Sequence, residues 1–270
     1  MEILGYIGAV LMGLSLGLIG GGGSILTVPI LVYLFSIDAV LATAYSLFIV
    51  GTTALFGSLS HMRMGNIQWR TALVFGIPSI AAVFATRAWL VPSLPDPLFR
   101  VGGTEVSKAL GMLVFFALLM VVAAYSMIRR PKSAGQPAMG DGGQPAFNYA
   151  LILGEGLVVG TVTGLVGAGG GFLIIPALVL LAKLPMKQAV VTSLVIIAAK
   201  SLIGFTGDLN GNEVIDWDFL LLFTAIAIGG IITGSALSKH VPNEKLKPAF
   251  GWFVLVMGVY IIGRELTHLS

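Results

Sequence analysis

The sequence has no cysteine and few charged residues, and both features exclude several classes of protein and of functional site. Without cysteine, its 270 residues hold no disulfide, no thiolate metal ligand and no thiol redox motif. Only 10% of the residues are charged, against roughly a quarter in soluble domains. Because 57% of the residues are hydrophobic, the outside of the folded chain must face lipid. The lipid bilayer is therefore its first expected partner.

The sequence also lacks the patterns of common enzyme and cofactor sites. No nucleophile–base–acid set and no carboxylate dyad is visible, and the three histidines have no metal-ligand spacing. Glycine-rich runs are present, but no lysine follows them and no strand–helix context surrounds them, which excludes a phosphate-binding loop. The net charge of +3 is small and does not indicate nucleic acid. We expect no enzyme activity, no cofactor, no metal and no nucleic-acid partner.

Ten apolar segments predict an all-α membrane protein with about 8–10 membrane segments, since a spanning helix needs about 20 apolar residues. They are residues 3–19, 23–36, 39–60, 70–91, 106–128, 148–166, 170–183, 187–207, 218–238 and 245–266. The second and the seventh have only about 14 residues each, which is typical of half-helices or re-entrant elements. A Gly-, Pro- and Gln-rich stretch separates the first five segments from the last five.

The two sets of five segments repeat each other at a fixed spacing. Gly17–Ser24, followed by Pro29, matches Gly164–Gly171, followed by Pro176, at an offset of 147 residues. The same offset places Ala42, Ser46, Leu47 and Gly57 on Ala189, Ser193, Leu194 and Gly204, and a one-residue slip then places Trp69 on Trp217. We predict a first membrane repeat over residues 1–128, a linker over 129–147 and a second membrane repeat over 148–270.

The cationic residues predict how the repeats lie in the membrane. If each repeat crosses an odd number of times, residues 61–70, 129–147, 183–187 and 239–247 share one side, with ten of the fifteen Lys and Arg. The positive-inside rule makes that side the cytoplasm. This predicts a multi-pass protein with a cytoplasmic linker, both termini outside and the repeats inverted. Inverted repeats with broken helices are typical of secondary transporters.

The two glycine clusters are candidates for an anion site. A glycine run lets the chain turn inside the membrane, so that the next short helix starts there with the positive end of its dipole exposed. Two such starts from inverted repeats can meet near the midplane and hold an anion. The predicted substrate-binding residues are Gly20, Gly21, Gly22, Gly23, Ser24, Gly167, Gly169, Gly170 and Gly171. The alternative is that these glycines serve only close helix packing.

Polar side chains on the following segments extend this candidate site. Ser46 and Thr53 are seven residues apart and share one helix face, and Ser193 and Lys200 occupy the matching positions of the second repeat, with Thr192 beside them. Hydroxyl groups on this face could donate to the oxygens of an anion. The alternative is that they bond their own helix carbonyls or a neighbouring helix.

Lys200 is the most specific single residue of the sequence. It lies roughly 20 Å from the cytoplasmic end of its segment at 1.5 Å per residue, and an intramembrane cation indicates function by default. It could bind the anion or carry a proton. The alternatives are an ion pair with Glu155, which would also make Glu155 a candidate for proton coupling, or an outward path toward Asp208.

These motifs resemble the sulfite exporter (TauE/SafE) family over nearly the whole chain. The resemblance rests on the paired glycine clusters followed by proline, on Ala42-x-x-x-Ser46-Leu47 and Ala189-x-x-x-Ser193-Leu194, and on Gly65-Asn66-Ile67-x-Trp69. It implies outward transport, across a bacterial inner (plasma) membrane, of a small anion such as sulfite or an organosulfonate (sulfoacetate, for example), with the glycine clusters, Ser46 and Ser193 at the substrate. The second repeat departs from the first in having Lys200 where the first has Thr53.

Two other functions remain open at this point. One is a permease for another small anion, such as a carboxylate. The other is a non-transporting membrane scaffold or sensor in sulfur metabolism, which would need neither an inward-facing Lys200 nor paired helix breaks. A homo-oligomer is compatible with the sequence.

Overall fold

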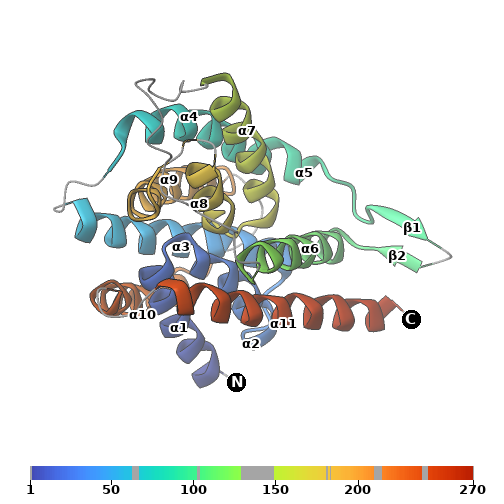
Figure 1. The fold of residues 1–270 in the computed structure, drawn as a ribbon. Coiled ribbons are helices and arrows are strands. Elements are labelled where there is room, and N and C mark those ends of the chain that lie inside the picture. The colour runs from blue at the N-terminus through green and yellow to red at the C-terminus, as the bar shows by residue number, and fades with distance from the viewer. Residues whose placement is uncertain are drawn as a thin grey trace.

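The computed structural model describes residues 2–62, 67–101, 104–128, 149–180, 182, 184–209, 215–238 and 243–269, most of them in helices (Figure 1). The predicted linker, 129–147, lies outside these residues. The first half of the chain holds α1 (Glu2–Ile19), the 3-10 helix η1 (Gly21–Leu26), α2 (Thr27–Leu34), α3 (Ala39–Met62), α4 (Trp69–Ala85), the π-helical turn η2 (Thr86–Leu90), α5 (Val91–Ser93), β1 (Phe99–Val101), β2 (Thr104–Val106) and α6 (Lys108–Ile128). The second half holds α7 (Tyr149–Val166), α8 (Gly171–Leu180), α9 (Met186–Thr206), α10 (Trp217–Leu237) and α11 (Asn243–Leu269).

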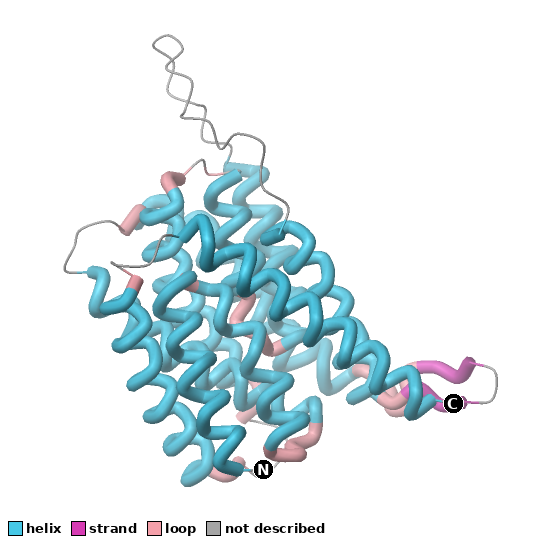
Figure 2. The backbone as a smooth tube through the Cα atoms, turned by 60° about the horizontal axis from the view of Figure 1, so that its bottom comes forward, coloured by secondary structure: helices cyan, strands magenta, loops and turns pink. Residues whose placement is uncertain are grey.

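The helices confirm an all-α membrane protein. Six of the helical stretches in the described residues are long and apolar enough to cross a bilayer, and two shorter apolar helices cover Gly21–Leu34 and Ala150–Val166. Large apolar side chains such as Val122, Leu221 and Val256 point outward and are exposed, as lipid-facing residues must be. Figure 2 shows these helices as one bundle.

A β-hairpin is the element that the hydropathy pattern did not predict. β1 and β2 pair antiparallel, with Phe99 opposite Val106 and Arg100 opposite Glu105. Three prolines between residues 92 and 97 stop the helix that precedes it, because proline cannot donate the next helical hydrogen bond. The hairpin projects to one side of the bundle beside the C-terminal end of α11 (Figure 2).

Helices from the two halves pack against each other in matching pairs. α1 packs on α10, and α7 packs on α4 (Figure 1). At the first contact Gly13 lies against the Ala227 carbonyl, and at the second Gly160 lies against the Ser79 carbonyl, each too close for a Cβ atom. Gly160 follows Gly13 by 147 residues and Ala227 follows Ser79 by 148, so the sequence repeat reappears in the packing.

α3 and α9, which are equivalent helices of the two halves, run antiparallel through the middle of the bundle. Gly57 near the end of α3 faces Leu194 near the start of α9, and Gly204 near the end of α9 faces Leu47 near the start of α3. These two contacts are related by the same offset of 147 residues. The inverted orientation of the whole halves across the membrane stays a prediction.

One hydrogen bond at each end of the α3–α9 pair follows the same relation. The backbone N–H of Gln68, which precedes α4, donates to the Thr192 hydroxyl at 3.1 Å. The backbone N–H of Asp216, which precedes α10, donates to the Tyr45 hydroxyl at 2.7 Å. Each half therefore anchors the start of one helix on a hydroxyl group of the other half.

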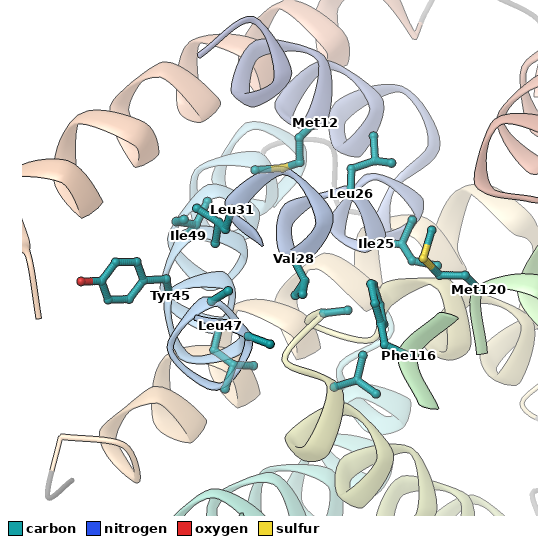
Figure 3. Close-up of a cluster of buried hydrophobic side chains, with 14 of the residues drawn as sticks. Met12, Ile25, Leu26, Val28, Leu31, Tyr45, Leu47, Ile49, Phe116 and Met120 are labelled. Atoms are coloured by element: carbon teal, nitrogen blue, oxygen red, sulfur yellow. The ribbon is translucent and has the colours of Figure 1, made fainter. Parts of the chain in front are cut away.

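The first glycine-rich connection is buried in the largest apolar core. Its side chains Ile25, Leu26 and Val28 lie among Met12, Leu31, Ile49, Phe116 and Met120, which come from α1, α2, α3 and α6 (Figure 3). Apolar contacts on these sides fix the connection inside the protein.

Candidate functional site

The first helix break lies between α1 and α2. α1 ends at Ile19, and Gly20 then adopts φ 79°, a left-handed conformation that glycine reaches at no steric cost. The next residues, Gly21 to Leu26, form the buried 3-10 helix η1 before α2 begins. The glycine cluster thus turns the chain inside the protein.

The second helix break uses more left-handed glycines. α7 ends at Val166 and α8 begins at Gly171, and between them Gly167, Gly169 and Gly170 have φ of 72°, 62° and 69°. Any other residue would be strained at these three positions. α8 therefore starts in the buried interior, with the positive end of its dipole inside the bundle.

The structure brings the two breaks into direct contact, which the repeat alone could not establish. Gly21 and Gly171 face each other so closely that a Cβ atom on either would collide with the Cα atom of the other. η1 also packs against α8. The two glycine clusters that the sequence predicts for one site, Gly20–Ser24 and Gly167–Gly171, are therefore brought together.

α3 forms one wall of the second break. Gly167 lies against Thr43 and Gly169 lies against Val50. Ser46 and Thr53 share the helix face of Val50, four residues before it and three after it. Both side chains are fully buried, and neither hydroxyl has a hydrogen-bond partner among the described residues. Two buried hydroxyl groups are thus available to a ligand on this wall.

α9 places Lys200 at the second break. The side chain is fully buried, and its Nζ donates to the Thr163 hydroxyl at 2.9 Å. A Cβ atom at Gly170 would lie 2.7 Å from the same Nζ, so the ammonium group sits against the glycine turn. No carboxylate pairs with Lys200 in the part of the chain that the structure describes.

Three other predicted residues lie apart from this cluster or have their hydroxyl engaged. The Ser193 hydroxyl donates to the Val190 carbonyl of its own helix at 2.8 Å. Thr192 accepts the Gln68 N–H and lies eight residues, about 12 Å along α9, from Lys200. Glu155 lies eight residues before Thr163 on α7, so the structure does not bring its carboxylate to the Lys200 ammonium.

Arg87 is the buried residue that sequence reasoning missed. Its side chain is 0% exposed on η2, and its Nε donates to Asp208 Oδ2 at 2.8 Å. Its Nη1 donates to Thr43 Oγ1 at 2.9 Å and to the Gly164 carbonyl at 3.2 Å. The signal was an arginine inside an apolar segment, but its position near the segment's end resembled an interfacial residue. Its acid partner lies 121 residues away, so the sequence could not indicate the pair.

Asp208 follows α9 and carries the carboxylate of this pair. Burial raises the pKa of its carboxyl group, and the Arg87 guanidinium opposes that rise. Lys200 contacts Thr163 and Arg87 contacts Gly164, so two buried cations bind consecutive residues in the last turn of α7. Two cations, a helix N-terminus and free hydroxyl groups can together replace the water around a bound anion.

Comparisons with known proteins indicate that the chain is a membrane transporter. The family model "Sulfite exporter TauE/SafE" matches residues 6–261. The chain is 26% identical to a "Probable membrane transporter protein" of Xylella fastidiosa over 96% of its own length and 94% of that protein. It is also 26% identical to the "Probable membrane transporter protein YunE" of Bacillus subtilis, over 96% of its own length and 98% of that protein. No solved structure matches the chain significantly. The matches identify a multi-pass membrane transporter and not an enzyme.

Proposed function

The chain belongs to the sulfite exporter TauE/SafE family, and from this premise we propose that it is a secondary exporter of a small sulfur-containing anion. Sulfite or an organosulfonate such as sulfoacetate is the proposed substrate. The observation that carries the proposal is Lys200, fully buried where the two helix breaks meet and without a carboxylate partner in the described residues. A buried ammonium group is costly unless an anion compensates its charge.

The proposed contacts follow from the donors at the second break. The Lys200 ammonium has three N–H groups, one of which binds Thr163, so two remain for an oxyanion. The N-terminal end of α8 and the hydroxyls of Ser46 and Thr53 add neutral donors and partial positive charge. Sulfite and sulfonates have several acceptor oxygens on one sulfur atom, which suits donors that converge from different helices.

We propose that the two halves move against each other to expose this site to either side. The antiparallel α3 and α9 and their matching end contacts support an inverted repeat, which is the usual basis of alternating access. The proposed orientation in a bacterial inner membrane has the termini outside and residues 129–147 in the cytoplasm. A reporter fused at Gly140 should read cytoplasmic and one at Gly211 external, and swapped signals would overturn the orientation.

A binding screen on the purified full-length protein tests the substrate. We expect sulfite or sulfoacetate to raise the melting temperature, and thiosulfate, taurine and acetate serve as competitors of related chemistry. Lys200→Met should abolish the shift, whereas Arg264→Met removes an exposed cation on α11 and should leave it unchanged. Preference for acetate would favour a carboxylate permease. Equal binding by the two variants would contradict a role for Lys200.

A further inference from the structure

Half of the anion-binding edge of the Arg87 guanidinium is unused. Nε and Nη2 lie on the same edge of the planar group, where a carboxylate or other oxyanion can accept from both at once. Asp208 accepts from Nε, but Nη2 has no hydrogen-bond partner among the described residues. The side chain is fully buried, so this donor lacks a partner where such a loss is costly. The Nη2 group can therefore donate to a second acceptor.

The other side of the guanidinium is held independently of Asp208. Nη1 donates to Thr43 Oγ1 on α3 and to the Gly164 carbonyl in the last turn of α7. Both partners belong to the walls of the second break, because Thr43 also lies against Gly167. If Asp208 moves away, these bonds still orient Arg87 with its Nε–Nη2 edge free.

Arg87 lies close to the Lys200 site, on the side of Asp208. The Cβ atom of Arg87 would lie 3.1 Å from one added at Gly207, and Lys200 precedes Gly207 by seven residues, or about 10 Å along α9. The two cations also bind the consecutive residues Thr163 and Gly164. Among the described residues, Arg87 is therefore the next buried cation from Lys200 toward the end of α9.

The described residues around Arg87 and Lys200 carry more positive than negative charge. Arg87 and Lys200 are the buried charged residues of the described chain, and the one carboxylate beside them, Asp208, pairs with Arg87 alone. That carboxylate belongs to a side chain 15% exposed at the edge of the bundle, whereas Arg87 is 0% exposed. Asp208 thus approaches Arg87 from the more open side, as an external anion would.

We propose that Arg87 is a second anion-binding station, and that Asp208 is a tethered carboxylate that occupies it between substrates. An oxyanion of the substrate, a sulfite or sulfonate group, accepts from Nε and Nη2 together and displaces Asp208 toward the surface. The identity of that oxyanion rests on the proposed function. The pair therefore closes the path when the station lacks substrate and opens it through competition between two anions for one guanidinium.

Titration of purified full-length variants with sulfite, sulfoacetate and acetate tests the station through the anion-dependent shift in melting temperature. Asp208→Asn removes the competitor while keeping the shape, so the half-maximal anion concentration should fall about tenfold. Arg87→Gln with Asp208→Asn removes both charges and should lose that gain. If Asp208→Asn binds no more tightly than the wild type, the station is overturned, even though wild-type binding that requires Lys200 would still support the proposed function.

A transport assay covers the case in which Asp208→Asn fails to fold. Arg87→Lys keeps the charge but not the fork, so sulfite transport in proteoliposomes should fall about tenfold while sulfite binding to the purified protein is retained. Unchanged transport by this variant would overturn the station. If the wild type binds none of the three anions, the proposed function fails, yet a shift that appears in Asp208→Asn and disappears with Arg87→Gln would still establish the station.

Discussion

The two helix breaks share one backbone design but differ in chemistry. Both turn the chain at left-handed glycines, and both lie against a small or β-branched side chain of the opposite half: Gly20 against Val190, and Gly167 against Thr43. These two contacts are equivalent at the offset of 147 residues. The scaffold around the breaks is therefore nearly two-fold.

The polar groups do not follow this relation. Lys200 corresponds to Thr53, its partner Thr163 corresponds to Leu16, and Arg87 corresponds to Ser235 after the one-residue slip. Both cations thus lie at the second break, although Arg87 belongs to the first half and Lys200 to the second, and the residues equivalent to them are neutral. A repeated scaffold can therefore provide the movement while one of its two breaks carries the charges for recognition.

The largest expected effect comes from moving the cation between the halves. Lys200→Thr should weaken sulfite binding at least about 100-fold, since a buried ammonium group beside Gly170 and its charge-assisted hydrogen bonds are lost. Adding Thr53→Lys should not restore binding, because the first half has Leu16 in place of Thr163. Isothermal titration of both proteins measures this. Full recovery in the double variant would show that the halves are chemically interchangeable.

An intermediate effect is expected from separating the breaks. Gly21→Ala and Gly171→Ala each force a Cβ atom into the facing backbone and should destabilise the protein by about 1–3 kcal/mol, with a matching loss of transport. Gly229→Ala on α10 is the control, because a Cβ atom there meets nothing within 4 Å. Thermal unfolding in detergent compares the three. A much larger loss for one break than for the other would contradict the two-fold scaffold.

The smallest effect concerns the two end contacts. Tyr45→Phe and Thr192→Val each remove the acceptor of one backbone N–H, of Asp216 and Gln68 respectively, and should each cost about 1 kcal/mol. Transport should respond to both, because the contacts join the two halves at opposite ends of the α3–α9 pair. Paired measurements of melting temperature and uptake rate test whether the ends are equivalent. Tyr33→Phe, which loses a bond to Glu265 between α2 and α11, serves as a control away from those ends.

Much of the fold was predictable because its signals are local. Apolar runs give the helices, and the glycine clusters give the two breaks, as at Gly20 and Gly167–Gly170. The hairpin at Phe99–Val106 was not, because six residues of strand give too short a pattern to stand out beside long apolar helices. Within the candidate site, the sequence predicted Lys200 and the glycines but could not indicate that Thr163 would be the partner of Lys200.

The sequence by itself determined that the chain is a helical membrane protein with two similar halves, a glycine break in each and a lysine deep within an apolar segment of the second. Hydropathy, glycine content and residue spacing suffice for this, because they act over a few turns of helix. Only the tertiary structure decided that Gly21 meets Gly171 and that Arg87 meets Asp208. Those contacts join residues more than a hundred positions apart, and packing of whole helices selects them rather than any local preference of the chain.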